Sequence, residues 1–363
     1  MKILFAYNRP RSDVWRDVKA GLVPDELMFG LSHFRKVGVD AEFTDEIFEP
    51  TRLEPLFRLF ERWFSRGGMF VGFSLGRALN IARLGTRYDL TVAWGDSTAL
   101  PLLMLKRFGR FNKPVVYSTV GLAWLIDHRR WMVPFIRALA RRAEFVVHYG
   151  WGEGSILRER LALPKSKLKF IPFCVDIRFF TDLATGGIPS DGKILALGRD
   201  RMRDWSTLFE AVKGSGVGIR LVCPKEAIEH LDVPLEVDWS PEVPYRRLKE
   251  LLGSAKAVVL PVVDNPYTAA TITMLEAMAA GRAVIVSRTR AIGQGYRFEQ
   301  NREIVFVEPG NPAALRDAIK RVAFDLDFCR RLGGRAREAM IERHSMRIWV
   351  DEWRRIFESC GRG

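Results

Sequence analysis

The sequence predicts an α/β protein built from two doubly wound domains, and three observations carry this prediction. Short uninterrupted apolar runs of strand length alternate with segments of helical periodicity. Such runs are typical of parallel strands buried on both faces. The alternation occurs twice along 363 residues, a length suited to two domains. Two Rossmann-like domains facing each other would form a ligand cleft at the carboxyl ends of their strands.

In the first half, the apolar runs expected as strands are Ile3–Tyr7, Leu90–Trp94, Val115–Tyr117, Phe145–His148 and Leu168–Pro172. The helical periodicity between them predicts helices over residues 24–36, 97–109, 129–142 and 154–161. The turn-prone segment Ile171–Asp176 then ends the pattern. The first predicted domain therefore covers residues 1–176 and is expected to bind the acceptor of any reaction.

The second half repeats the pattern, with strands expected at Ile194–Gly198, Ile219–Cys223, Ala257–Val262, Ala283–Ser287 and Ile304–Val307. Helices are predicted near residues 204–214, 244–253, 269–280 and 311–323. The second predicted domain covers residues 177–345. Apolar side chains recur on one face of Arg347–Ser359, so residues 346–363 are expected to form an amphipathic helix that crosses back and packs on the first domain.

The chain is strongly basic, with 57 Lys and Arg against 43 Asp and Glu, a net charge of +14 and a pI near 9.9. A hydrophobic content of 48% excludes wholesale disorder. Residues 51–150 carry 16 basic and six acidic side chains, so most of the excess lies in the first domain. This balance predicts an anionic partner: nucleic acid, a membrane surface or a phosphorylated substrate.

The cysteines are widely spaced and form no metal-binding pattern, which predicts free thiols in a reducing compartment and no metal site. No signal peptide and no apolar run of membrane-spanning length is visible. We therefore expect a cytoplasmic protein with at most peripheral contact with the inner face of a membrane.

The stretch Ala257–Ser287 carries the most specific chemistry. It is expected to run as strand, loop, helix, tight turn at Gly281 and strand. Small residues at the helix start, among them Ala270 and Thr271, would let an anion approach the backbone N–H groups there. Two turns into the helix, Glu276 could accept hydrogen bonds from a vicinal diol such as a ribose. The alternative is a surface glutamate on an ordinary helix.

Four segments resemble glycosyltransferases of the GT-B fold, especially the retaining family 4 (group 1) enzymes. LEAMAAGRAVIVS, ending at Ser287, resembles the close of their E-x7-E motif. GRDRMRDWSTLFEAV (198–212) resembles their pyrophosphate-binding segment, and KLKFIPFCVDIRFF (167–180) resembles their interdomain segment. NPAALRDAIKRVAFDLDFCRRLGGRARE (311–338) resembles their closing helices. The resemblance covers about the C-terminal 200 residues.

The resemblance implies roles for individual residues of the second domain. Glu276 falls on the second glutamate of the motif, which binds the nucleotide ribose, whereas Thr268 stands where the first glutamate contacts the donor sugar. Arg199 matches the arginine that binds the diphosphate. Arg203 and Arg201 compete for the second basic position, and Arg203 is favoured because it adjoins the next helix. The alternative for these arginines is solvated surface charge.

Three further residues have two interpretations each. Trp239, in the segment 236–241, is expected either to cover the nucleotide base or to pack in the core. Asp96, directly after a strand, and His128 are candidates to deprotonate an acceptor hydroxyl, and both also fit a capping role. In the resembling enzymes the leaving diphosphate itself often takes that proton. The run Gly150–Ser155 resembles an incomplete dinucleotide fingerprint and receives no ligand role.

Two segments mix arginine with aromatic residues, Leu56–Phe70 and His128–Arg142. In the second, Trp131, Phe135 and Leu139 recur at helical spacing, with Met132 and Ile136 adjoining them. The arginines Arg130, Arg137 and Arg141 are expected on the other side. One interpretation is an apolar stripe packed on the sheet, with the arginines in water. The other is docking on anionic lipid. Nucleic-acid binding is not expected, since no known binding module accompanies these segments.

The resemblance thus implies metal-independent transfer of a sugar, with retention, from a UDP- or GDP-sugar, with no cofactor. The basic charge of the first domain favours a lipid-linked or anionic cell-envelope glycan as the acceptor. Arg199, Arg203 and Glu276 would stabilise the departing nucleotide. A rival enzyme class is a sugar-nucleotide epimerase or phosphorylase on the same fold. A rival of another kind is a basic membrane- or nucleic-acid-binding protein with a vestigial site, which Thr268 keeps open.

Overall fold

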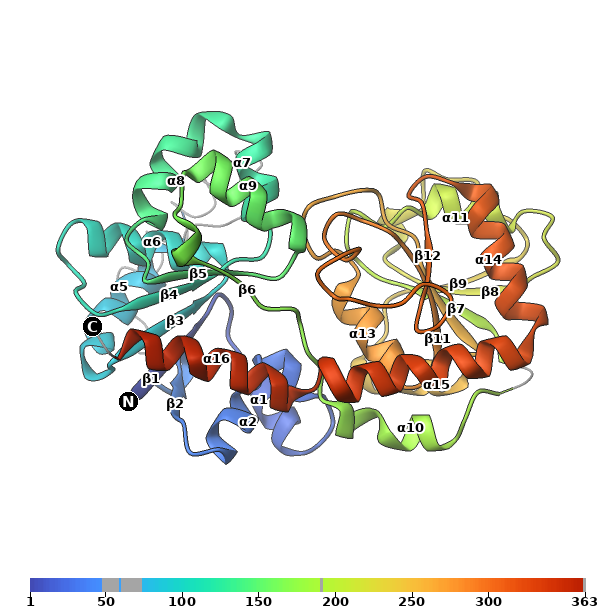
Figure 1. Ribbon diagram of the computed structural model, residues 1–363, viewed down its shortest axis with the longest axis horizontal. Helices are drawn as coiled ribbons and strands as arrows, with labels where there is room; N and C mark the ends of the chain where they lie inside the picture. Colours follow the sequence, from blue (N-terminus) through green and yellow to red (C-terminus); the bar gives the residue numbers. More distant parts are fainter. Residues whose placement is uncertain (48–58, 60–73, 190–191, 362–363) are drawn as a thin grey trace. The chain divides into compact units, whose positions relative to one another are not determined.

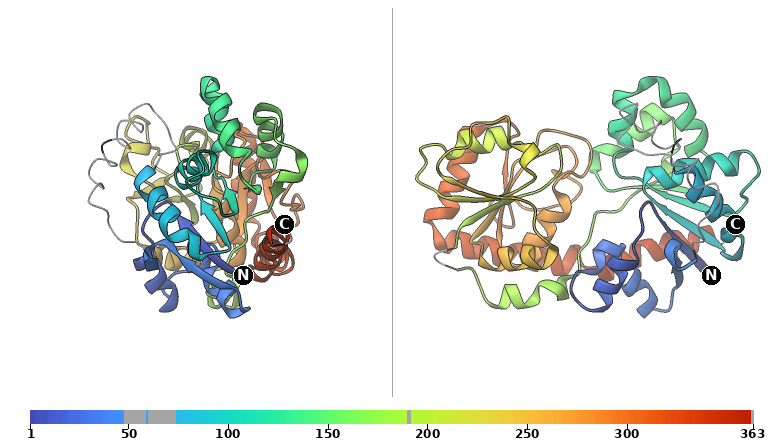
Figure 2. Two further views of the ribbon diagram at one scale, coloured as in Figure 1. Left: turned by 90° about the vertical axis from the view of Figure 1, so that its left-hand side faces the viewer. Right: turned by 180° about the vertical axis from the view of Figure 1, so that it is seen from behind.

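The computed structural model describes residues 1–47, 59, 74–189 and 192–361 of the chain. Its contacts divide the chain into two compact units, each built on one six-stranded parallel sheet with helices on both sides (Figures 1 and 2). Unit 1 comprises Met1–Lys19, Leu27–Ile171 and Trp349–Gly363. Unit 2 comprises Ala20–Glu26 and Pro172–Ile348. The α/β class predicted from the sequence is confirmed.

The sheet of unit 1 has the order β2-β1-β3-β4-β5-β6. Its strands are β1 (Lys2–Tyr7), β2 (Asp40–Phe43), β3 (Leu90–Trp94), β4 (Val115–Ser118), β5 (Phe145–His148) and β6 (Leu168–Phe170). Its longer helices are α1 (Ser12–Lys19), α2 (Leu31–Lys36), α5 (Leu75–Leu84), α6 (Asp96–Arg107), α7 (Leu122–His128), α8 (Val133–Ala140) and α9 (Trp151–Leu161). The short helix α3 (Thr44–Ile47) follows β2. The direction of winding reverses between β1 and β3, so the loops after these strands flank the switch point.

The sheet of unit 2 has the order β12-β11-β10-β7-β8-β9, which is the Rossmann order. Its strands are β7 (Ile194–Leu197), β8 (Ile219–Val222), β9 (Val237–Ser240), β10 (Ala257–Leu260), β11 (Ala283–Ser287) and β12 (Val305–Val307). Its helices are α10 (Thr181–Thr185), α11 (Trp205–Val212), α12 (Tyr245–Ser254), α13 (Thr271–Ala279), α14 (Pro312–Phe324) and α15 (Leu326–Arg343). The direction of winding reverses between β7 and β10, so the carboxyl ends of these two central strands are the expected place for a ligand.

Alternate residues of the unit 2 strands face one apolar core with α11 and α14. Ala196, Leu221, Val259 and Ile285 contribute to it, together with Leu208 of α11 and Ile319 of α14. The intervening strand residues, such as Leu195 and Val258, are also buried, on the opposite face of the sheet. Burial on both faces is the reason that these strands appear in the sequence as uninterrupted apolar runs.

The last helix, α16 (Met346–Cys360), packs its aromatic face within unit 1. The Trp349 indole N–H donates to the carbonyl of Phe29 over 2.9 Å. The Trp353 ring lies 4.7 Å from the Trp94 ring at the end of β3. The apolar face predicted from the sequence is therefore the face that is buried.

Two predicted helices were wrong in detail, and one strand was missed. The helix expected over 24–36 is two pieces, the 3-10 helix η1 (Asp25–Met28) and α2, because Phe29 and Gly30 take positive φ of 52° and 82° between them. The helix expected over 129–142 is the 3-10 helix η3 (Arg130–Met132) followed by α8. The strand β2 was missed, because its four residues alternate acidic and apolar side chains at the edge of the sheet.

Candidate functional site

The loops after β7 and β10 are joined at the switch point of unit 2. Arg203, in the loop after β7, forms an antiparallel bridge with Val262, directly after β10. On either side, the Asp204 N–H donates to the carbonyl of Pro261 over 3.0 Å, and the Val263 N–H donates to that of Met202 over 2.9 Å. These bonds hold the arginine-containing loop over the carboxyl ends of the two central strands.

The Arg203 side chain lies against the backbone of Gly198. A β-carbon on Gly198 would come within 2.2 Å of Arg203 Nε, and Gly198 has φ of 146°, where side chains are strained. The close approach therefore requires glycine at position 198. Asp200 fixes the rest of the loop, since its Oδ1 accepts hydrogen bonds from the Met202 N–H over 2.8 Å and from the Tyr267 hydroxyl over 2.9 Å.

Arg203 is a buried cation with unused donors. The residue is 8% exposed, and its Nε and Nη1 have no hydrogen-bond partner among the described residues. Burial lowers the pKa of Arg203 to about 10, while the Asp200 carboxylate opposes that shift, so the guanidinium stays charged at neutral pH. A buried charge with unpaired donors is costly unless an anion binds it. The geometry is that of an anion site.

A pocket of about 570 Å³ opens beside Arg203. The residues that line it come from the loops after β7 and β10, the start of α11 and the segment after β8. They include Arg199, Arg201, Trp205, Pro224, Glu226, His230 and Val263. Arg199 is largely exposed, with 77% of its side chain accessible, and its Nε pairs with Glu242 over 2.8 Å. Arg201 is exposed as well. The structure therefore places all three sequence-predicted arginines on one pocket.

The loop after β10 leads into the start of α13. Ala270 precedes the helix with φ of 65°, and the Thr271 N–H is taken by the carbonyl of Thr268 over 3.3 Å. Asn265 Oδ1 and Thr271 Oγ1 are buried without a hydrogen-bond partner among the described residues. Sequence analysis missed Asn265. Unsatisfied polar atoms of this kind mark a place where a polar ligand would complete the hydrogen bonding.

Glu276 is buried within α13 and shares its surroundings with a second carboxyl group. The Tyr245 hydroxyl donates to Glu276 Oε1 over 2.7 Å. Burial raises the pKa of Glu276 to about 7, and the Tyr245 hydrogen bond opposes the shift. Glu26 also lies in unit 2, where its Oε2 accepts the Asp176 N–H over 2.9 Å. Burial and the charge of Glu276 raise the pKa of Glu26 well above its ordinary value. Sequence analysis missed both Glu26 and Tyr245.

Trp239 packs at least partly as a core residue. It lies on the edge strand β9, contacts the apolar core of unit 2, and its indole N–H donates to the Cys223 carbonyl over 3.1 Å. These contacts fix the ring at the carboxyl end of β8. The base-covering interpretation stays a prediction.

In unit 1, Asp96 follows β3 at the switch point and is buried in a polar cluster. Its Oδ1 accepts the Tyr117 hydroxyl over 2.5 Å and the Thr119 hydroxyl over 2.6 Å. Burial raises the pKa of Asp96 to about 6, and these two bonds oppose the shift. His128 is separate from this cluster: it is exposed, its Nδ1 lies 2.8 Å from the Trp124 carbonyl, and its ring stacks on Trp124.

Glu153, within the incomplete fingerprint Gly150–Ser155, closes the turn from β5 to α9. Its Oε2 accepts the Gly150 N–H over 2.8 Å, which ties down the first turn of the helix. Burial raises the pKa of Glu153 to about 8, and the Asp96 charge acts in the same direction. The glycines around it therefore serve a buried helix start.

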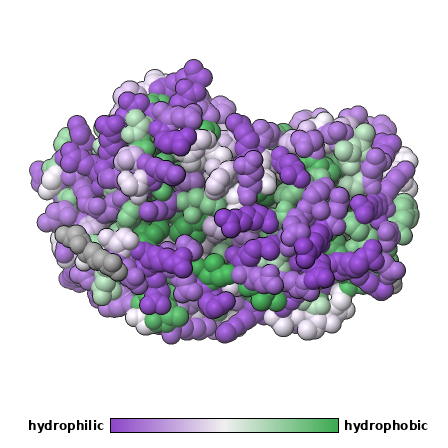
Figure 3. Space-filling model, viewed as in Figure 1, coloured by the Kyte–Doolittle hydropathy of each residue, from purple (hydrophilic) through white to green (hydrophobic). Residues whose placement is uncertain are grey.

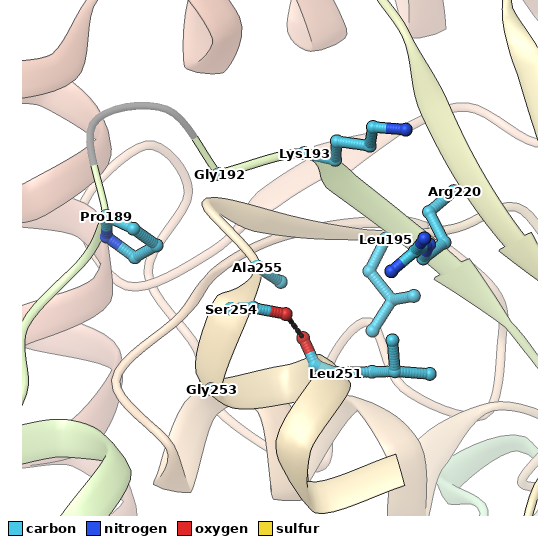
Figure 4. A pocket seen from close by; sticks show the side chains of 9 residues that line it. All are labelled: Pro189, Gly192, Lys193, Leu195, Arg220, Leu251, Gly253, Ser254 and Ala255. Atoms are coloured by element: carbon cyan, nitrogen blue, oxygen red, sulfur yellow. Dashed lines mark hydrogen bonds between the residues drawn. The ribbon is translucent and has the colours of Figure 1, made fainter. Parts of the chain in front are cut away.

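A second hollow in unit 2, of about 340 Å³, lies at the opposite ends of the strands (Figure 4). Lys193 and Ala255, which line it, directly precede β7 and the start of β10. Its two basic side chains, Lys193 and Arg220, both pair with Asp238, over 3.0 and 3.4 Å. This carboxylate already pairs with both cations and offsets part of their charge, so this hollow offers less to an anion than the pocket at Arg203.

Comparison with known proteins agrees with this geometry. Residues 210–325 match the family Glycosyl transferases group 1. An uncharacterised glycosyltransferase of Methanocaldococcus jannaschii is 35% identical over 98 residues, which span 27% of this chain and only 24% of that protein.

Two solved structures align over almost the whole chain. Sucrose-phosphate synthase from Thermosynechococcus elongatus aligns with a TM-score of 0.69 and 16% identity, over 99% of each chain. HepE from Anabaena, in complex with UDP and glucose, aligns with a TM-score of 0.68 and 14% identity, over 99% of this chain and 100% of that one. The chain therefore has the GT-B fold, and the match to the Glycosyl transferases group 1 family is confined to residues 210–325 of unit 2.

Proposed function

We propose that this protein is a glycosyltransferase that takes a sugar from a nucleoside diphosphate bound by unit 2. The observation that carries the proposal is Arg203, a buried cation with two unpaired nitrogens at the switch point of a Rossmann sheet. A diphosphate supplies the acceptor oxygens that these nitrogens lack. Arg199, on the same pocket, provides a second cation. Together the buried Arg203 and the exposed Arg199 would stabilise the negative charge that builds on a leaving diphosphate.

The nucleoside part of the donor is proposed to lie toward Glu276. Its carboxyl group can accept hydrogen bonds from ribose hydroxyls, with Tyr245 orienting Oε1. UDP is the favoured nucleotide, since HepE, which shares the fold, has been solved with UDP-glucose. GDP is the alternative. The donor sugar is proposed to contact the loop 264–268, where Thr268 and Asn265 replace a charged contact with neutral polar groups.

The reaction is proposed to retain the configuration of the sugar and to need no metal, since the arginines supply the positive charge. The proposed acceptor is a lipid-linked or cell-envelope glycan bound by the basic unit 1, in the cytoplasm at the inner face of the membrane. Among the described residues, every helix is too short or too polar to cross a bilayer. The basic segment Leu56–Phe70 lies, apart from Leu59, outside the described residues.

Titration calorimetry of the full chain with UDP and with GDP at physiological salt tests the donor site. We expect one of the two to bind with a stoichiometry of one, and a negligible signal for both would contradict the proposal. Release of that nucleoside diphosphate from its sugar in the presence of acceptor distinguishes transfer from epimerisation, which releases none. The anomeric configuration of the product, read by NMR, tests retention.

A further inference from the structure

Two aromatic side chains of unit 1, Trp131 and Phe135, are exposed to solvent, although the segment η3–α8 that carries them packs against the core of the unit. In η3 and α8, Met132, Ile136 and Leu139 face the core of unit 1 and are buried. Trp131, by contrast, is 73% exposed and Phe135 is 41% exposed. The apolar stripe expected from the sequence is therefore packed at Met132, Ile136 and Leu139. The rings of Trp131 and Phe135 instead remain on the surface.

Uncompensated positive charge surrounds these rings. The run from His128 to Ala143 contains five arginines and no acidic residue. Within the described ranges, Arg130, Arg137, Arg141 and Arg142 form no ion pair with a carboxylate. Arg137 and Arg141 donate only to carbonyls, those of Arg160 and Ala162. In Figure 3, hydrophilic side chains dominate the surface over α7, α8 and α9.

We infer that Trp131, Phe135 and the neighbouring Arg130 and Arg142 form a docking surface for an anionic phospholipid bilayer; we call these four residues the Trp131 surface. Tryptophan favours the boundary between water and hydrocarbon, because its ring is apolar and its N–H needs a polar partner. Each basic residue close to an anionic leaflet strengthens binding by about fivefold. An anionic bilayer suits both kinds of side chain. The aromatic rings would enter the headgroup layer, and the arginines would contact lipid phosphates.

Charge argues against a second copy of the chain on this surface. A symmetric dimer brings the same patch of each copy together, so it would place Arg130 and Arg142 of one copy opposite the same two arginines of the other. An anionic layer neutralises them. The Trp131 surface belongs to unit 1, whereas the pocket at Arg203 belongs to unit 2.

Co-sedimentation of the full chain with vesicles tests the inference. We expect binding to vesicles of phosphatidylcholine mixed with phosphatidylglycerol, and at least about tenfold weaker binding to phosphatidylcholine alone. W131A/F135A is expected to lower the affinity for anionic vesicles about tenfold or more, and R130Q/R142Q to lower it comparably and to reduce its salt dependence. Phe324, which is 72% exposed on unit 2, provides the matched control, and F324A is expected to bind as the wild type does.

Three outcomes would overturn the inference. The first is absence of wild-type binding to anionic vesicles, and the second is unchanged vesicle binding by W131A/F135A. The third is stronger binding of the same surface to single-stranded nucleic acid or to a second copy, measured by fluorescence anisotropy and by light scattering. Circular dichroism melts confirm that each variant is folded, and UDP affinity is expected to be the same in all of them. A failure here therefore leaves the proposed donor site untouched.

Discussion

Replacing Arg203 by alanine is expected to lower kcat/KM for the nucleotide sugar by roughly a thousandfold. Its Nε and Nη1 have no partner among the described residues, and the proposed diphosphate would supply their hydrogen bonds. A hydrogen bond to a charged group contributes about 1.5–3 kcal/mol, and about 1.4 kcal/mol corresponds to a tenfold change. The loss of two such bonds gives a factor of about 10² to 10⁴. Steady-state kinetics with the nucleotide identified by calorimetry measures the effect.

Stability separates this role from a structural one. Arg203→Ala removes a buried charge with unpaired nitrogens, so Tm is expected to stay the same or to rise. A lower Tm with unchanged kcat/KM would show instead that Arg203 supports the fold. Arg199→Ala is expected to cost at most about tenfold, because that side chain is exposed and its pairing with Glu242 is screened by solvent. The exposed Arg201 provides the matched control, and Arg201→Ala is expected to have the smallest effect of the three.

Gly198→Ala is expected to reproduce the loss without changing any charge. The added β-carbon would fall 2.2 Å from Arg203 Nε, and φ of 146° at that position disfavours a side chain. The guanidinium must then move away from the carboxyl ends of β7 and β10. Normal turnover by this variant, measured in the same assay, would contradict the proposed position of Arg203 on the diphosphate.

The local parts of this picture are readable from the sequence because their causes are local. The strands β3, β5 and β11 appear as apolar runs with the same bounds that the structure shows, since burial on both faces leaves few polar positions. Edge strands are covered less completely, and β2 was missed for that reason. The helix α8 shows a different limit. Its periodicity predicts a helix, yet Ile136 and Phe135 are adjacent, and only the packed fold determines which of them faces inward.

The candidate site likewise contains some residues that the sequence identifies and others that only the folded structure reveals. Arg203 and Glu276 belong to contiguous segments that resemble a known family, so the sequence singles them out. Glu26 lies 250 positions before Glu276, and no local pattern connects the two. Only folding brings these carboxyl groups close enough for the charge of one to shift the pKa of the other. Tyr245 is similar, because its hydroxyl reaches Glu276 from a different helix.

The buried carboxyl group of Glu276 is expected to make the protein less stable as the pH rises. Its pKa in the folded protein is about 7, above the ordinary 4.5, so protonation favours the folded state. This contribution is complete below about pH 4.5 and is lost as the pH rises through about 7. The shift corresponds to a loss on the order of 3 kcal/mol in the free energy of unfolding. Glu276→Gln removes the ionisation, so urea unfolding should show it to be more stable than the wild type at pH 8 and equally stable near pH 4.5.

Two further variants test whether the same carboxyl group is the proposed ribose ligand. Tyr245→Phe removes the hydrogen bond that lowers the pKa of Glu276, so its loss of stability should move to higher pH than in the wild type. Burial, and then the charge of Glu276, raise the pKa of Glu26 well above its ordinary value. Affinity for UDP should increase from pH 6 to pH 8 more steeply in the wild type than in Glu276→Gln. The UDP phosphate itself titrates in this range, but it does so equally with both proteins, so comparing them cancels its contribution. If the wild type and Glu276→Gln show the same pH dependence of stability, Glu276 does not ionise in this range. If the two proteins bind UDP with the same affinity, Glu276 is not the ribose ligand, and the proposed role of Arg203 is unaffected.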